Sequence, residues 1–165
     1  MKKAVLSLLV DNTAGVLSRV SGLFSRRGYN IDSLSVGETE DPKYSRMTVV
    51  VSGDDRIINQ IEKQLIKLED VAEVVQLDTA SVCRELILIK VKASREEKPQ
   101  IISVADVFRA NIVDVSKDSL IIELTGNTSK IDAFVGLLDG FKIEEMARTG
   151  LTALSRGNAA MNYDE

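Results

Sequence analysis

The chain has no histidine and only one cysteine, Cys83, among its 165 residues. Catalysis by a serine–histidine or cysteine–histidine pair is therefore excluded, and so is any zinc site that needs a histidine ligand. One cysteine cannot form a disulfide within the chain. A lone cysteine beside an apolar strand is typical of a small core residue in a reducing compartment.

Long apolar runs and aromatic residues are also scarce. No stretch of about 18 apolar residues exists, so the sequence predicts no membrane span. The apolar run at residues 4–10 is short for a signal peptide and leads directly into Asp11, so we expect a soluble cytoplasmic protein. Aromatic residues make up 4% of the chain, and the formal net charge is −4. Both values argue against nucleic-acid binding, which usually needs a basic balance and stacking side chains.

The hydrophobic pattern predicts an α+β protein built from two successive ferredoxin-like βαββαβ domains, over residues 1–78 and 79–165. In the first, strands are expected at residues 4–10, 31–37, 47–51 and 71–75, with helical stripes at 16–24 and 57–68. In the second, strands are expected at residues 86–91, 112–115, 120–124 and 141–147, with helical stripes at 101–108 and 131–138. Gly28 is expected to end the first helix, and Asp54 or Asp55 to cap the second.

The two halves share the chemistry of their junctions as well as their order of elements. RGYNID at residues 27–32 resembles RANIVD at 109–114, and VSGD at 51–54 resembles LTGN at 124–127. We interpret this as two copies of one architecture, although convergent turn chemistry would also produce such pairs. The polar residues 155–165 are expected to fray.

The turn after the first strand is the strongest candidate for a ligand site. It reads DNTAGVL at residues 11–17. A glycine at the start of a helix lets a small ligand approach the main chain, and bare N–H groups there favour an anionic group. The alternative is an ordinary strand-to-helix turn capped by Asn12 or Thr13. The second half has REEKP at residues 95–99 instead, so any ligand pocket is expected in the first half.

The combination of motifs resembles a known family. An apolar strand, then Asp-x-x-x-Gly-Val-Leu, then a helix in a βαββαβ unit is similar to the ACT domain, which senses amino acids. The whole chain resembles the regulatory (small) subunit of acetolactate synthase, also called acetohydroxyacid synthase, from end to end except around residues 94–108 and in the last few positions. The segments that carry this resemblance are GVLSRV (15–20), LFSRRGYNI (23–31), SRMT (45–48), IEKQL (61–65), REL (84–86) and LSRG (154–157).

The resemblance implies a protein without an active site or a cofactor of its own. Such subunits bind a catalytic subunit that holds thiamine diphosphate, raise its activity, and confer feedback inhibition by valine or another branched-chain amino acid. ACT domains pair with the ligand between them, which implies at least a homodimer. The ligand would meet Asn12, Gly15, Val16 and Leu17 of one subunit, and Asn30 and Ile31 of its neighbour. Many ACT domains have proline before the glycine, where this chain has Ala14.

The chemistry of these residues suits a free amino acid. N–H groups at a helix start can bind its carboxylate, whereas the side-chain amides of Asn12 and Asn30 can donate or accept and so can serve either end. Val16, Leu17 and Ile31 would form a short apolar pocket for a branched side chain.

Three other functions remain open at this stage. A phosphatase of the acylphosphatase type would need an arginine in the turn, but residues 11–17 contain none, and Asp11 would repel phosphate. An RNA-binding module would need aromatic residues on its central strands, and the expected strand at residues 47–51 has none. An amino-acid sensor that acts on a different metabolic partner would share the same fold and the same turn.

Overall fold

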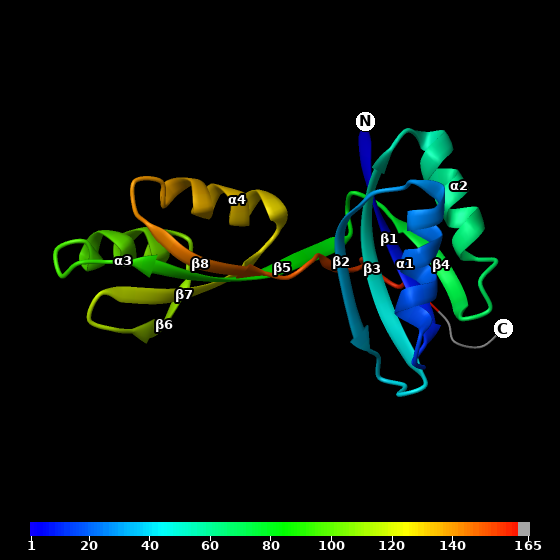
Figure 1. Cartoon of the computed structure of the whole chain (residues 1–165), viewed down its shortest axis with the longest axis horizontal. Helices are drawn as coiled ribbons and strands as arrows, with labels where there is room; N and C mark the ends of the chain where they lie inside the picture. The colour runs from blue at the N-terminus through cyan, green and yellow to red at the C-terminus, as the bar shows by residue number, and fades with distance from the viewer. Residues whose placement is uncertain (162–165) are drawn as a thin grey trace. The chain divides into compact units, whose positions relative to one another are not determined.

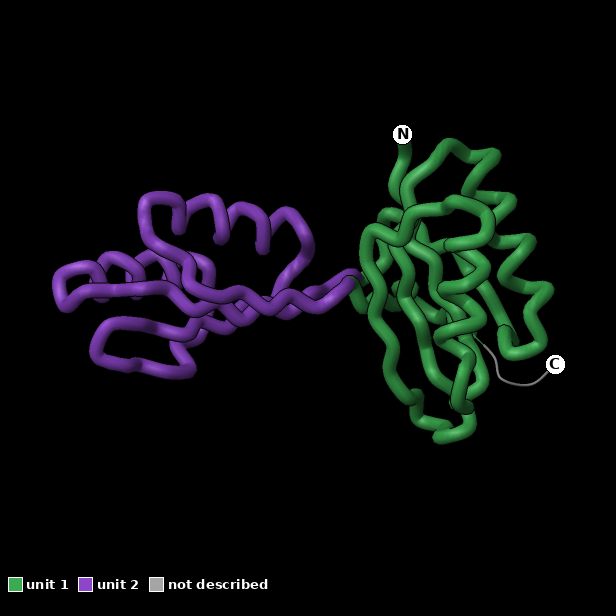
Figure 2. The backbone as a smooth tube through the Cα atoms, viewed as in Figure 1, with its two compact units in different colours: residues 1–82, 151–165 green, residues 83–150 purple. Residues whose placement is uncertain are grey.

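The structure is a computed structural model that describes residues 1–161, and it divides into two compact units (Figures 1 and 2). Unit 1 contains residues 1–82 together with the described residues from Leu151 onward, and unit 2 contains residues 83–150. No helix within residues 1–161 is long and apolar enough to cross a membrane.

Unit 1 has the expected βαββαβ order. Its elements are β1 (Lys2–Asp11), α1 (Val16–Arg27), β2 (Ile31–Glu38), β3 (Tyr44–Gly53), α2 (Asp55–Leu65) and β4 (Val71–Leu77). The four strands form one antiparallel sheet in the order β2-β3-β1-β4. This order leaves β2 and β4 at the edges and puts β1 in the centre, where its apolar run is covered on both sides by neighbours.

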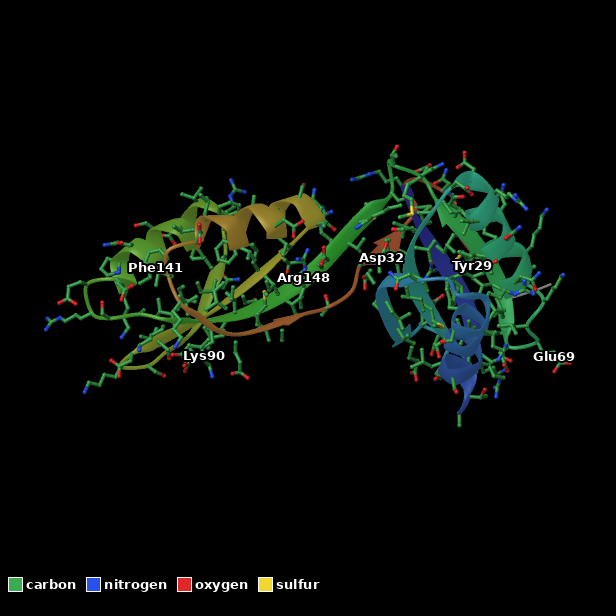
Figure 3. The ribbon with its side chains drawn as sticks, turned by 45° about the horizontal axis from the view of Figure 1, so that its top comes forward. Tyr29, Asp32, Glu69, Lys90, Phe141 and Arg148 are labelled. Carbon is green, nitrogen blue, oxygen red and sulfur yellow. The ribbon has the colours of Figure 1, made fainter. Side chains whose placement is uncertain are left out.

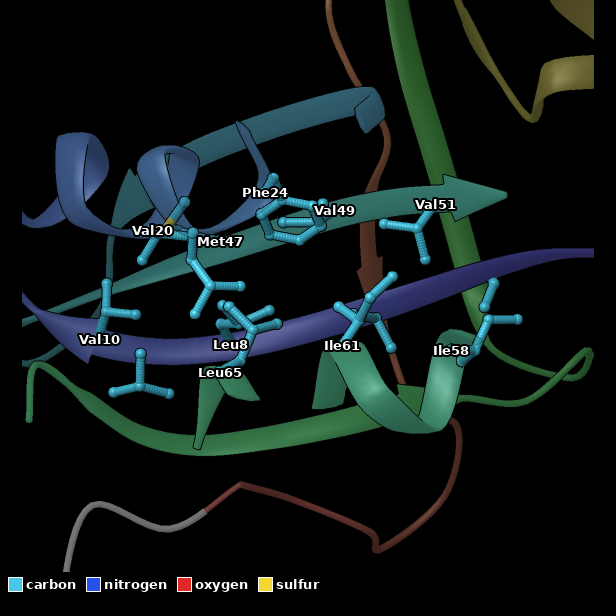
Figure 4. Packing of buried hydrophobic residues seen from close by; sticks show 14 of the residues in the cluster. Leu8, Val10, Val20, Phe24, Met47, Val49, Val51, Ile58, Ile61 and Leu65 are labelled. Atoms are coloured by element: carbon cyan, nitrogen blue, oxygen red, sulfur yellow. The ribbon is translucent and has the colours of Figure 1, made fainter. Parts of the chain in front are cut away.

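The core of unit 1 lies between the sheet and its two helices (Figure 4). Leu6 and Leu8 of β1 are fully buried, and alternation along the strand directs them to the same face. They pack with Phe24 of α1 and Ile61 of α2, and each such buried side chain stabilises the fold by roughly 1.5–3 kcal/mol.

The predicted ends of both helices are confirmed by their backbone geometry. Gly28 ends α1 with a φ of 69°, and its N–H donates to the carbonyl of Ser25 at 3.2 Å. Asp54 caps α2, since its Oδ1 accepts a hydrogen bond from the N–H of Ile57 at 2.8 Å.

Unit 2 repeats the architecture of unit 1. Its elements are β5 (Val82–Lys92, whose first residue is counted with unit 1), α3 (Lys98–Val107), β6 (Asn111–Val115), β7 (Ser119–Gly126), α4 (Thr128–Leu137) and β8 (Ile143–Arg148). The strand order β6-β7-β5-β8 corresponds position by position to that of unit 1. Its separate core is centred on Ile87, Ile89 and Phe134. The predicted α+β fold with two ferredoxin-like units is therefore confirmed.

The end of the chain departs from the sequence-based expectation. The second domain was expected to extend to residue 165, but unit 2 ends at Gly150 and the described residues from Leu151 onward belong to unit 1, although β9 (Thr152–Leu154) among them pairs with β5. Thr48 and Val50 on the helix-free face of the first sheet are buried, and Ala153 is only 2% exposed. Because no helix covers this face, the returning segment shields it from water.

Residues 155–161 also make specific contacts where fraying was expected. Arg156 Nε donates to the carbonyl of Ala80 at 2.6 Å, and Arg46 Nη1 donates to Met161 Sδ at 3.3 Å. The rest of the expected fraying tail, residues 162–165, lies outside the described residues.

Candidate functional site

The turn that follows β1 is anchored by two backbone hydrogen bonds. The N–H of Asp11 donates to the carbonyl of Asp70, and the N–H of Asn12 donates to the carbonyl of Lys43, each at 2.8 Å. These bonds tie the turn to the chain before β3 on one side and to the chain before β4 on the other. The position of the turn is therefore fixed by the sheet and not only by its own sequence.

Gly15 is the N-cap of α1 and has a left-handed backbone, with φ 87° and ψ −9°. A residue with a Cβ is strained in this region by roughly 1–2 kcal/mol, so the turn favours glycine for a conformational reason. As a glycine, the N-cap residue has no side chain that could bond to the helix start. The alternative in which Asn12 or Thr13 caps the helix is therefore not the arrangement observed.

Arg19 is a residue of this site that the sequence reasoning missed. A Cβ added to Gly15 would lie only 2.8 Å from Arg19 Nη1, so the guanidinium group packs closely over the turn. Arg19 forms an ion pair with Asp70, and that hydrogen bond raises the pKa of Arg19 above its ordinary value. Its position four residues after Gly15, on the same face of the helix, was the available signal.

Asn12 has a narrower chemical role in the structure than in the sequence. Its Nδ2 donates to Glu38 Oε2 and to the carbonyl of Pro42, both at 3.0 Å. Since an amide nitrogen carries two hydrogens, both are used, and the side chain can meet a ligand through its acceptor, Oδ1. Together with the nearby carboxylate of Glu38, this arrangement favours an ammonium group over a carboxylate.

The two apolar residues at the start of α1 lie in different environments. The side chain of Val16 is 4% exposed and belongs to the core, so only its backbone can contact a ligand. Leu17 is 48% exposed and offers apolar surface next to the turn. The expectation that the Val16 side chain lines a pocket is thus corrected: its helix position directs that side chain into the core.

Asn30 and Ile31 lie at the opposite end of the same sheet. In the strand registers Asp11 pairs with Tyr44, whereas Ile31 pairs with Val51, seven residues further along β3. At 3.3 Å per residue this separates the two groups by about 23 Å. One chain therefore does not bring all the predicted site residues together, and a site that uses them all needs two copies.

Asn30 has a local partner in its own chain. Its Nδ2 donates to Asp32 Oδ1 at 2.8 Å, and Ser52 also donates to the carboxylate of Asp32, which is labelled in Figure 3. Asn30 is exposed, and Ile31 is half-buried at the edge of the core.

The corresponding turn of unit 2 is a capped helix start. The N–H of Ser94 donates to Glu97 Oε1 and the N–H of Glu97 donates to Ser94 Oγ, both at 3.2 Å. These reciprocal bonds between a serine and a glutamate three residues later have the pattern of a capping box. Within residues 1–161, no cluster of three or more cysteine, aspartate or glutamate side chains could hold a metal ion.

Unit 2 has an ionic cluster around Glu85, a buried glutamate on its central strand β5. Glu85 accepts hydrogen bonds from Arg148 Nε at 2.6 Å and from Thr128 Oγ1 at 2.7 Å. Arg148, which is labelled in Figure 3, also pairs with Asp132 at 2.9 Å. Burial alone would raise the pKa of Glu85, but the hydrogen bonds from Arg148 and Thr128 outweigh it and lower that pKa. The cluster links β5, β8 and α4 and has a structural role.

Two tandem βαββαβ units, the first with an ACT-type turn, define a regulatory protein of the ACT class. A family model described as the AHAS small subunit-like ACT domain matches residues 6–73, and one described as the small subunit of acetolactate synthase matches residues 84–157. The chain therefore belongs to the family of acetolactate synthase small subunits, the non-catalytic regulatory subunits of that enzyme complex.

Individual relatives support this assignment over nearly the whole chain. The probable acetolactate synthase small subunit of Methanothermobacter thermautotrophicus is 52% identical over 159 residues, covering 95% of each chain. The isozyme 3 small subunit of Salmonella typhimurium is 46% identical, covering 96% of this chain and 99% of its own. The crystal structure of the Thermotoga maritima small subunit matches with a TM-score of 0.90 at 45% identity, covering 96% of this chain and all of that one.

Proposed function

We propose that the chain activates the catalytic subunit of acetolactate synthase and makes it sensitive to feedback inhibition by valine or another branched-chain amino acid. The thiamine diphosphate of the reaction belongs to the catalytic subunit, and this chain has no cofactor of its own. The observation that supports the proposal best is the turn at Gly15, with its left-handed glycine and a helix start that its N-cap leaves without a side-chain bond.

The groups around the turn match the two charged ends of an amino acid. The helix start supplies N–H groups for the carboxylate, and Arg19 adds a positive charge beside them. Asn12 Oδ1 and the neighbouring Glu38 suit the ammonium group. Leu17 provides exposed apolar surface for an aliphatic side chain, with a discrimination of about 1–3 kcal/mol per methylene.

The second half of the site would come from a neighbouring copy. β2 is an edge strand, and two copies of an edge strand can pair antiparallel across a two-fold axis. Antiparallel pairing sets the start of one strand beside the end of the other. Asn30 and Ile31 of one copy would then approach the turn at Asn12 of its neighbour. Pairing would thus bring together residues that lie about 23 Å apart, or about seven residues of strand, within one chain.

Reconstitution with the purified catalytic subunit tests the function. We expect the chain alone to have no acetolactate synthase activity, to raise the rate of the catalytic subunit on addition, and to make that rate fall with added valine. Asn12→Ala should weaken valine inhibition while activation is retained. Glu38→Gln should also weaken valine inhibition, because it keeps an acceptor for Asn12 Nδ2 and removes the charge proposed to meet the ammonium group. Failure of the wild-type chain to change either rate would contradict the proposal.

A further inference from the structure

We infer that β2 and the segment 151–161, here called the C-terminal strap, carry the effector signal from unit 1 to the chain that leaves unit 2, with Ser33 and Ser35 as positioning residues. This inference rests on the proposed effector site and adds the route by which its occupancy leaves unit 1. It assigns a regulatory role to two serines that contact neither the ligand turn nor a catalytic group.

The first contact is a clamp on the backbone of Leu151. Ser35 Oγ donates to the carbonyl of Leu151 at 2.7 Å, and the N–H of Leu151 donates to Ser33 Oγ at 3.0 Å. Ser35 Oγ also lies 3.2 Å from Thr152 Oγ1, within hydrogen-bond distance. Both backbone groups of Leu151 are thus held by side chains that project from the same face of β2.

The second observation is that β2 meets a part of the proposed site at each end. Asn30 and Ile31 lie at its start, and Glu38 at its end accepts the hydrogen bond from Asn12. A ligand that displaces Asn12 therefore acts on the end of β2 through Glu38. Ser33 and Ser35 lie between these two ends, so a shift of the strand reaches Leu151 directly.

The third observation concerns the chain on the other side of Leu151. Thr149 belongs to unit 2, where its N–H donates to the carbonyl of Leu86 and its Oγ1 accepts from the N–H of Leu86, both at 2.9 Å. Only Gly150 separates this residue from Leu151. Leu151 of unit 1 and Thr149 of unit 2 are thus joined by a single residue of chain, which is the covalent route that we assign to the signal.

The remainder of the strap is held independently of the two serines. Ala153 is buried, Arg156 bonds to Ala80, and Met161 accepts from Arg46, whose Nη1 also donates to Ser7 at 2.7 Å. Removing the serine hydroxyls should therefore leave the strap bound and the unit folded, while the link between β2 and Leu151 is lost.

The test uses the double variant Ser33→Ala/Ser35→Ala with Ser103→Ala as the matched control. Ser103 in α3 makes a local bond, from its Oγ to the carbonyl of Pro99 at 3.0 Å. Calorimetry should show that the isolated double variant binds valine within about twofold of wild type. In the reconstituted enzyme, activation should persist, but the valine concentration for half-inhibition should rise at least about tenfold, within the usual range of coupling between sites. The control should behave as wild type.

Hydrogen exchange provides a readout that a merely structural role would not change. Valine should alter the protection of the Leu151 amide in the wild-type chain and leave it unaltered in the double variant. Normal inhibition of the double variant overturns this inference alone, as does a loss of valine binding or of activation, or an unchanged Leu151 amide in the wild type. A wild-type chain that does not bind valine overturns the proposed function, and this inference with it.

Discussion

Arg19 packs over Gly15 so closely that a Cβ at residue 15 would lie 2.8 Å from Arg19 Nη1. This relationship changes what a substitution at Gly15 can reveal. Any side chain there encounters two obstacles, the left-handed backbone and the guanidinium group. A single substitution would therefore mix strain with an effect on ligand binding, and a matched pair of variants is needed.

Gly15→Ala and Gly15→Asp form that pair, because both add a Cβ and only the second adds a charge. Each should lower the free energy of unfolding by roughly 1–2 kcal/mol, since Arg19 is flexible enough to move aside. Gly15→Asp should additionally abolish valine inhibition, as like charges about 4 Å apart repel by up to about 4 kcal/mol, on the order of a thousandfold in affinity. Valine titration of the reconstituted enzyme compares the two, and equal curves would remove the turn from the carboxylate site.

Asn30→Ala should weaken the valine response more than it weakens folding. Its bond to Asp32 is local and exposed, so its loss should cost at most about 1 kcal/mol of stability. Ser52→Ala is the control, because it removes the other hydrogen bond to Asp32 and leaves Asn30 in place. Thermal melts and valine titrations separate the roles. If both variants change the valine response equally, Asn30 acts only by holding Asp32.

The chain should be at least a dimer in solution. β2 is an edge strand of its sheet, and unpaired edges are usually covered in native proteins. The proposed site also needs Asn30 and Ile31 from a second copy. Light scattering at micromolar concentration should report at least twice the chain mass of 18.1 kDa. A species of 18.1 kDa alone would contradict the shared site.

The ionic cluster at Glu85 should make unit 2 sensitive to acid. The pKa of Glu85 is lowered from its ordinary value of 4.5, so near that pH the unfolded chain binds more protons than the folded chain. The stabilisation is complete above about pH 4.5 and disappears as the pH falls through the lower, folded value. Denaturant melts should show stability falling over this range in wild type and falling less in Glu85→Gln.

Removing the Glu85 side chain should lower the free energy of unfolding more than neutralising its charge does. Glu85 is 7% exposed, so Glu85→Ala leaves Arg148 and Thr128 without their acceptor and should cost about 1–3 kcal/mol. Glu85→Gln retains an acceptor and should cost less. Equal losses in the two variants would show that neither the retained acceptor nor the side-chain volume at residue 85 stabilises unit 2, and would contradict this prediction.

The sequence by itself determined the local architecture of this protein. The apolar run at residues 4–10 identified β1 as a buried strand, Gly28 marked the end of α1, and Asp54 or Asp55 marked the start of α2, where the structure has Asp54 as the cap. The glycine turn at residues 11–17 was also recognisable. These features follow from backbone preference and from the periodicity of apolar residues, which act over a few neighbouring positions.

The tertiary structure decided which partners these residues have. From sequence, the Asn12 amide could serve either end of an amino acid; in the structure Glu38 and Pro42 accept its two hydrogens. The Val16 side chain could likewise line a pocket by its sequence position, but in the structure it is buried in the core. The return of the C-terminal strap to unit 1 has no periodic signal, because it depends on a sheet face left without helices. Such contacts join residues up to 118 positions apart, as in Leu151 with Ser33, and only folding brings them together.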